Sequence, residues 1–195
     1  MMLIGEQMKF LEFIDNIHSK QCSPCSTTER VFVFVTGEAG TGKSYLLINV
    51  VDMLEELDPR CTLVVAYTGY AAINVKGSTI HAGLKLQIDA GKSQRDDEEI
   101  KEKALQTLEM LTKKLSNLKW LIIDEISLVS DHFFGIIDLR LRSIKKCNEP
   151  FGGVNVLVFG DLLQLPPVSA KPIYANSLWK MFKMYQLKYI HRQES

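Results

Sequence analysis

Apolar and polar positions along the chain follow two different periods. Residues 31–36 are a short run of β-branched and aromatic side chains with no polar face, which is typical of a parallel strand buried on both sides. Residues 37–42 break this run with glycines, and residues 43–57 then carry apolar side chains at helical spacing. The pattern predicts a strand, a glycine-rich turn and a helix in direct succession.

The same alternation continues toward the end of the chain. Further strands are predicted at residues 62–67, 120–124, 154–160 and 186–190, and further helices at residues 6–17, 69–75, 100–118 and 131–145. Residues 77–81 are predicted to form a turn, and residues 91–99 a charged, exposed segment. This order predicts one three-layer α/β domain over residues 1–195, with a mostly parallel sheet covered on both faces.

Amino-acid composition indicates the class of protein but does not indicate which partner it binds. With 46% hydrophobic and 24% charged residues, the chain is expected to be soluble and globular. Its longest apolar run is too short to cross a bilayer, and residues 1–10 lack the features of a secretory signal. The 23 basic and 23 acidic side chains balance, but a local basic patch, not the sum, decides whether a chain binds nucleic acid.

Four cysteines are spread along the chain without a dense disulfide framework. This suits a reducing intracellular setting, the nucleus or a mitochondrion in a eukaryote. Cys22 and Cys25 form a single C-x-x-C in a polar loop, and with His18 nearby a closed zinc site would still lack one ligand. A plain surface loop is therefore the simpler interpretation, with a zinc or redox role as its alternative.

The glycine-rich turn matches the phosphate-binding motif G-x-x-x-x-G-K-[ST] in its required setting, between a buried strand and a helix. Its backbone N–H groups would turn toward phosphate oxygens, where the helix amino terminus adds a favourable field. We expect Lys43 to reach the β- and γ-phosphates of ATP, and the Ser44 hydroxyl to hold Mg²⁺. A glycine-rich turn that binds nothing is the alternative. The residues predicted to contact the nucleotide here are Gly37, Glu38, Ala39, Gly40, Thr41, Gly42, Lys43 and Ser44.

Two further polar sites follow buried strands. Asp124 and Glu125 end the strand at residues 120–124, which places both carboxylates at the sheet edge that carries the phosphate loop. Asp124 is expected to position Mg²⁺, and Glu125 to activate the attacking water as a general base. Gln164 follows the next strand and is placed to bond both the γ-phosphate and a water, although the residue pattern fits a turn-capping loop residue equally well.

Beyond these motifs, the chain resembles the first RecA-like domain of a superfamily-one DNA helicase of the petite-integration-frequency (Pif-type) family. The resemblance is carried by residues 37–44, 68–72 (TGYAA), 77–81 (GSTIH), 124–125 and 160–168 (GDLLQLPPV). The GSTIH and QLPPV segments are the most specific to this family. The similarity covers nearly the whole chain, from about residue 3 to residue 193.

The resemblance implies an ATP-driven motor that moves on single-stranded DNA and unwinds it 5′ to 3′, in replication, repair, recombination or telomere maintenance. It implies that Gln7 reads the adenine and that Arg192 meets the γ-phosphate. The residues that it places along the DNA are Thr68, Gly69, Thr79 and His81. On the residue pattern alone, these positions are ordinary helix, turn, cap and core residues.

The chain departs from the family pattern in two respects. Tyr67 and Tyr70 flank the TG pair where the family usually has proline before it and a basic or small residue after it; they either stack on bases or pack inward. The chain also stops at Ser195, where the family's second RecA-like domain, with its arginine finger, would follow. We therefore expect a monomeric piece that binds Mg-ATP and hydrolyses it slowly. The alternatives are a nucleotide-dependent DNA-binding module without motor activity and an unrelated P-loop ATPase.

Overall fold

The computed structural model describes residues 3, 5–22, 29–86, 97–164, 166–167 and 170–188. Its strands are β1 (Phe32–Gly37), β2 (Thr62–Ala66), β3 (Ser78–Thr79), β4 (Trp120–Asp124), β5 (Asn155–Gly160) and β6 (Lys183–Leu187). Its α-helices are α1 (Gly5–Cys22), α2 (Lys43–Leu57), α3 (Gly69–Asn74), α4 (Ile80–Leu84), α5 (Asp97–Lys114) and α6 (Asp131–Lys145). Short 3₁₀ helices are η1 (Ile126–Leu128), η2 (Pro150–Gly153), η3 (Ile173–Ala175) and η4 (Ser177–Met181).

The six strands form one sheet in the order β3-β2-β4-β5-β1-β6. Every pairing between these strands is parallel, as the predicted alternation of strands and helices requires. The central strands β4 and β5 are buried along their whole length, whereas the edge strand β6 is mostly exposed. The predicted three-layer α/β domain with a mostly parallel sheet is confirmed.

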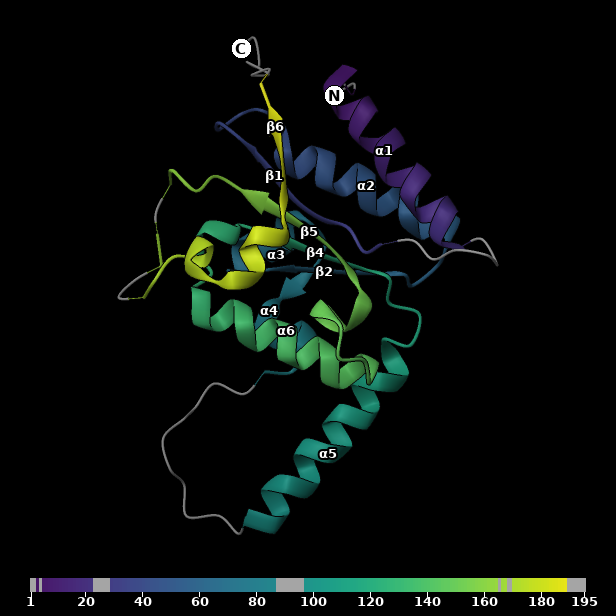
Figure 1. The fold of residues 1–195 in the computed structure, drawn as a ribbon, viewed down its shortest axis with the longest axis vertical. Helices are drawn as coiled ribbons and strands as arrows, with labels where there is room; N and C mark the ends of the chain where they lie inside the picture. Colours follow the sequence, from purple (N-terminus) through teal and green to yellow (C-terminus); the bar gives the residue numbers. More distant parts are fainter. Residues whose placement is uncertain are drawn as a thin grey trace.

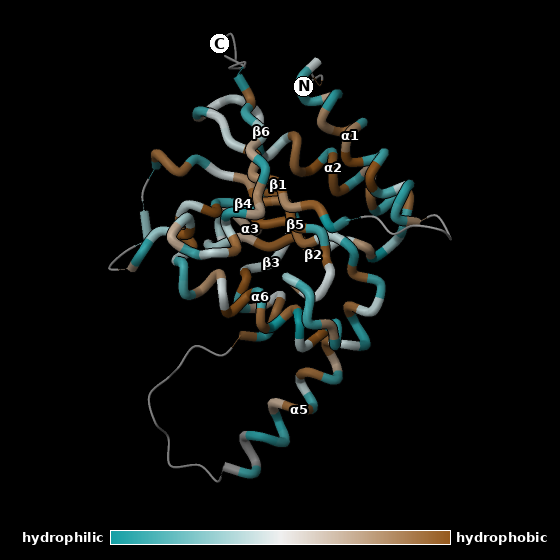
Figure 2. Tube along the Cα trace, viewed as in Figure 1, coloured by the Kyte–Doolittle hydropathy of each residue, from teal (hydrophilic) through white to brown (hydrophobic). Residues whose placement is uncertain are grey.

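Helices cover both faces of the sheet because side chains along each strand alternate in direction. In β1, Val33 and Val35 join a core with α1 and α2, while Phe32 and Phe34 join a second core with α4 and α6. Figure 1 shows these two helical layers on opposite sides of the strands. Figure 2 shows the hydrophobic colouring concentrated in the central strands between them.

The carboxyl ends of the strands form one edge of the sheet, and the first turn of α1 contacts β6 and the residue after it. The Tyr185 hydroxyl in β6 donates to the carbonyl of Glu6 at 2.7 Å, and the Lys188 N–H donates to the Glu6 carboxylate at 3.0 Å. Helix α5 instead extends away from the domain in Figure 1. Within the described residues, no helix is both long enough and apolar enough to span a membrane.

Several predicted boundaries differ from the structure. Residues 77–81 do not form a simple turn, because Ser78 and Thr79 pair with β2 and Thr79 then caps α4. The last strand begins at Lys183 instead of residue 186, since β6 takes its register from β1, and residues 189–190 lie outside the described part. Helix α5 begins at Asp97, inside the segment predicted as exposed and charged, most of which also lies outside the described residues.

Candidate nucleotide-binding site

The loop of residues 37–44 joins the end of β1 to the start of α2. Gly40 and Gly42 have φ angles of 84° and 78°, in the left-handed region that side chains with a Cβ disfavour. Between them, Thr41 is buried and its hydroxyl donates to the Glu38 carbonyl at 2.8 Å. The glycines therefore permit the turn, and Thr41 fixes its shape from inside.

Lys43, the first residue of α2, lies across the mouth of this loop. Its Nζ atom donates to the carbonyl oxygens of Gly37 at 2.6 Å and Glu38 at 3.0 Å. Burial lowers the pKa of the Lys43 ammonium, while the charges of Asp161 and Asp124 act in the opposite direction. The ammonium is thus held at the centre of the loop, where an anionic ligand would replace its carbonyl partners.

Gln7 lies behind the same loop, although it is far from it in sequence. It is fully buried on α1, and its side-chain Nε2 donates to the Thr41 carbonyl at 3.4 Å. This contact places the predicted adenine-reading residue against the loop from the side of α1.

Asp124 and Glu125 follow the buried strand β4 at the same edge. Asp124 is only 6% exposed, and its Oδ1 accepts the Glu125 backbone N–H at 2.9 Å. Burial raises the pKa of the Asp124 carboxyl, and the Glu125 charge adds to this. The Glu125 N–H, the Lys43 charge and a hydrogen bond with Ser44 oppose the shift. A hydroxyl and a carboxylate in contact are the hard oxygen donors that Mg²⁺ prefers, so these residues fit the ion.

Glu125 adopts a left-handed backbone conformation, with φ of 54°. Its Oε2 accepts a hydrogen bond from the Thr68 hydroxyl at 2.9 Å, a contact between residues far apart in the chain. The sequence patterns placed Thr68 and Glu125 in separate motifs and gave no sign that they touch.

A cavity of about 340 Å³ at this edge gathers those predicted catalytic side chains that the structure describes. Gln164 lines it with an exposed side chain, whereas the turn that carries Gln164 is held by Asp161, whose carboxylate accepts the Leu163 N–H at 3.0 Å. The Asp161 side chain therefore caps the turn on which Gln164 lies. The cavity also includes Asn74 and Ser127, which no motif singled out. Its described lining is Lys43, Ser44, Ala71, Asn74, Asp124, Glu125, Ser127, Leu128, Gly160, Asp161 and Gln164.

The residues predicted to contact DNA follow β2 and β3, beside this cavity. Thr68 and Thr79 each cap a helix through their hydroxyls, and Gly69 is exposed at the start of α3. His81 is partly exposed and stacks on Phe133, with ring centres 4.8 Å apart. The sequence missed Phe133, because one apolar residue on a helix carries no signal of its own.

The two tyrosines that flank Thr68 and Gly69 differ in their surroundings. Tyr70 is 77% exposed and does not pack inward. Tyr67 is 40% exposed and meets Phe133 edge-on. Both rings are thus open to solvent at the edge where the DNA residues were predicted.

The chain is similar to known proteins of one family. A family model described as PIF1-like helicase matches residues 4–195. The chain belongs to the PIF1-like helicase family. The resemblance read from the GSTIH and QLPPV segments is therefore confirmed.

Relatives and solved structures agree with this family. The chain is 40% identical over 142 residues to the ATP-dependent DNA helicase PIF1 of Xenopus laevis, an alignment that covers 70% of this chain and 20% of the relative. It is 38% identical over 137 residues to human PIF1, with 70% and 20% covered. The crystal structure of Pif1 helicase from Candida albicans superposes with a TM-score of 0.78 at 30% identity, covering 100% of this chain and 41% of that one.

A structure of Bacteroides Pif1 bound to single-stranded DNA also superposes on the PIF1-like domain, with a TM-score of 0.70 at 30% identity, covering 100% of this chain and 44% of that one. The chain spans about a fifth of the length of the PIF1 relatives that it matches. These structures confirm the fold expected for the PIF1-like domain.

Two of the predicted features involve residues outside the described part of the PIF1-like domain. Arg192 lies there, and so does Cys25, the second cysteine of the C-x-x-C. Cys22 ends α1, and its Sγ lies 3.7 Å from His18 Nε2 and accepts from Lys119 Nζ at 3.2 Å.

Asp58 completes a cluster of potential metal ligands with His18 and Cys22, the one such cluster among the described residues. The Trp120 indole donates to His18 Nδ1 at 3.1 Å, which places the proton of the neutral ring on Nε2, facing Cys22. The Lys119 ammonium also lies 2.6 Å from the Asp58 carboxylate. A protonated nitrogen and an ammonium both oppose a cation, so the cluster is not arranged to hold a metal.

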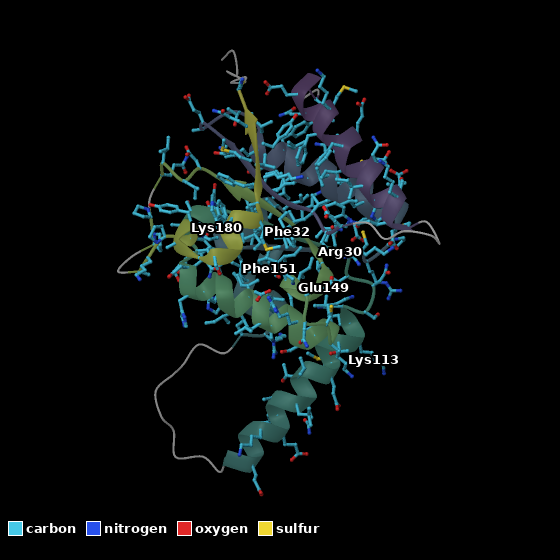
Figure 3. The ribbon with its side chains drawn as sticks, viewed as in Figure 1. Arg30, Phe32, Lys113, Glu149, Phe151 and Lys180 are labelled. Carbon is cyan, nitrogen blue, oxygen red and sulfur yellow. The ribbon has the colours of Figure 1, made fainter. Side chains whose placement is uncertain are left out.

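A larger cavity of about 560 Å³ lies at the opposite end of the strands. Figure 3 shows Arg30, Phe32 and Glu149 there, near the start of β1. The cavity is mostly apolar, and none of the residues predicted to bind nucleotide, metal or DNA lines it. We therefore place the candidate site of the PIF1-like domain in the smaller and more polar cavity at the carboxyl edge.

Proposed function

We propose that this chain is the ATP-binding first motor domain of an ATP-dependent DNA helicase that acts on single-stranded DNA. The observation that carries the proposal is the convergence of Lys43, Asp124, Glu125 and Gln164 on one cavity at the carboxyl ends of parallel strands. Ligands bind at this end of open α/β sheets. Family membership supports the proposal, because the PIF1 relatives are named ATP-dependent DNA helicases.

The loop of residues 37–44 holds the phosphates of ATP in this proposal. Its backbone N–H groups and the Lys43 ammonium contact the phosphate oxygens, and Gln7 reads the adenine from behind the loop. Ser44 and Asp124 would hold Mg²⁺. The bound ion would neutralise charge on the β- and γ-phosphate oxygens.

Glu125 acts as the general base for hydrolysis. It accepts a proton from the water whose oxygen attacks the γ-phosphorus, as the bond to the ADP leaving group breaks. Gln164 positions the water and the γ-phosphate at the rim of the cavity. Arg192 contacts the γ-phosphate in the same scheme, by family resemblance.

Single-stranded DNA lies along the edge formed by the segments that follow β2 and β3. Thr68, Gly69, Thr79 and His81 contact it there, and the Bacteroides relative that matches this fold was solved bound to single-stranded DNA. The open rings of Tyr67 and Tyr70 lie at this edge and offer faces for bases, which stack on aromatic side chains in many single-strand-binding proteins.

Residues 1–195, tested without a second RecA-like domain, are expected to hydrolyse ATP slowly. A second RecA-like domain supplies an arginine finger in this family, and such a finger increases the rate by about 10³- to 10⁵-fold in P-loop enzymes. We further propose that the chain is monomeric and intracellular, and that the helicase acts 5′ to 3′ in DNA replication, repair, recombination or telomere maintenance.

Equilibrium binding of a fluorescent ATP analogue tests the nucleotide half of this proposal. Wild-type protein is expected to bind the analogue in the presence of Mg²⁺. Lys43→Ala is expected to weaken binding by about tenfold or more, because it removes a hydrogen-bonded charge. Glu125→Gln is expected to bind normally yet fail to hydrolyse ATP. Equal binding by wild type and Lys43→Ala would reject the assigned site.

A further inference from the structure

The Thr68 hydroxyl makes two hydrogen bonds, one as an acceptor and one as a donor. As an acceptor, it takes the Ala71 backbone N–H at 3.1 Å and caps the amino end of α3. As a donor, it makes a hydrogen bond to Glu125 Oε2 at 2.9 Å. The first bond is local, whereas the second joins the end of β2 to the acid pair that follows β4.

This hydroxyl therefore lies between the two surfaces that the proposed function requires. Glu125 lines the nucleotide cavity together with Lys43 and Gln164. On the other side, Thr68 is only partly buried, and its neighbours Gly69 and Tyr70 are exposed. One side chain thus reaches both the predicted general base and the edge proposed to carry DNA.

A threonine hydroxyl has a single proton to donate. A DNA phosphate can only accept hydrogen bonds, and so can an ionised carboxylate. The proton of Thr68 can therefore serve Glu125 or a phosphate, but not both. The two acceptors also repel each other, because both are negatively charged.

We propose that Thr68 is a positioning residue that couples DNA binding to ATP hydrolysis, because its hydroxyl donates a hydrogen bond either to Glu125 or to a DNA phosphate. Without DNA, Thr68 holds the Glu125 carboxylate against the start of α3 and occupies Oε2. A DNA phosphate accepts the hydrogen bond from the Thr68 hydroxyl in place of Glu125, which frees Glu125 to meet the attacking water. This inference rests on the proposed function, since it requires DNA at this edge and Glu125 as the base.

Rates of ATP hydrolysis with and without oligo(dT) test the coupling in Thr68→Val. Valine keeps the shape of threonine but has no proton to donate. The DNA-free rate is expected to rise about 2- to 10-fold, the range of one net hydrogen bond, and the response to oligo(dT) is expected to be lost. Thr68→Ser retains the hydroxyl and should restore both the low DNA-free rate and the response.

Ser130→Ala is the matched control for the lost helix cap. The Ser130 hydroxyl accepts the Phe133 N–H at 3.1 Å and caps α6, as Thr68 caps α3, but no hydrogen bond joins it to the acid pair. This variant should keep the wild-type ratio of the two rates. A Thr68→Val variant whose DNA-free rate does not rise, or that still responds to DNA, overturns the inference.

Binding of labelled oligo(dT) without nucleotide provides a second test that does not depend on turnover. Without Glu125, the Thr68 hydroxyl is available to donate to a DNA phosphate. Glu125→Ala should therefore bind DNA about 2- to 10-fold more tightly than Asp124→Ala. Both variants lose one carboxylate at adjacent positions, and only Glu125 accepts from Thr68. Equal affinities would overturn the coupling. If wild-type protein neither binds oligo(dT) nor responds to it, the proposed function itself fails.

Discussion

Gly37 ends β1 at a point of close approach, and Gly37→Ala should disturb both the fold and the nucleotide loop. A Cβ atom added there would lie 2.7 Å from the Thr41 hydroxyl and 2.9 Å from the Leu187 carbonyl. Neither neighbour can move freely. The Thr41 hydroxyl is bonded to the Glu38 carbonyl, and Leu187 is paired with Gly37 in the sheet.

The size of the effect follows from these contacts. Relief requires β1 and β6 to separate by several tenths of an ångström at their carboxyl ends. Overpacking of this kind costs about 1–3 kcal/mol. For a chain of this length, each kcal/mol lowers Tm by about 2–4 °C, so the expected decrease is roughly 2–12 °C. ATP affinity should fall as well, because the displaced Thr41 hydroxyl, which bonds to the Glu38 carbonyl, would no longer hold the phosphate loop in its shape.

Thermal unfolding and binding of a fluorescent ATP analogue measure the two effects on the same samples. Gly5→Ala is the matched control, because a Cβ at Gly5 meets nothing within 4 Å. It should stay within about 0.5 kcal/mol of wild type, as surface substitutions usually do. If Gly37→Ala matched Gly5→Ala in both Tm and affinity, the close approach of Thr41 and Leu187 would not restrict the residue at position 37.

Two further substitutions test the electrostatics and the polar core. Burial raises the pKa of Asp124 above its ordinary 3.8, so this carboxyl favours folding below that pH and the contribution is lost as pH rises through the raised pKa. Asp124→Asn should therefore abolish hydrolysis and yet be more stable than wild type in urea unfolding at pH 7. This gain in stability should shrink as the pH falls toward 3.8, and a gain that does not depend on pH would contradict the prediction. Asn155 is fully buried and accepts the Val31 N–H at 2.9 Å. Asn155→Leu should cost about 1–3 kcal/mol in urea unfolding because it leaves that donor unpaired, whereas the exposed control Asn148→Leu should change little; equal losses would count against this role.

The sequence was most informative where one physical requirement dominates a segment. Strand β4 and helices α2 and α6 have the predicted boundaries because burial on both faces, or along one helical stripe, leaves few alternatives. The phosphate-loop motif was equally clear, because its glycines and its Lys-Ser pair must stand in a fixed order between a strand and a helix.

The remaining features depend on contacts between distant segments. The edge strand β6 is mostly exposed, so its register comes from β1 and from Glu6 and not from its own pattern. Strand β3 is too short to show any period, and its pairing with β2 replaced the predicted turn. The hydrogen bond from Thr68 to Glu125 joins two motifs whose spacing in sequence says nothing about their distance in space.

Hydrolysis of ATP with and without oligo(dT), with Lys43→Ala as the blank, is the direct test of whether this chain is a DNA-responsive ATPase. We expect slow hydrolysis by the wild-type chain. The rate should require Mg²⁺, exceed the Lys43→Ala rate and rise when oligo(dT) is added. A wild-type rate equal to that of Lys43→Ala, or one that oligo(dT) leaves unchanged, would contradict the assignment of this chain as a DNA-responsive motor domain.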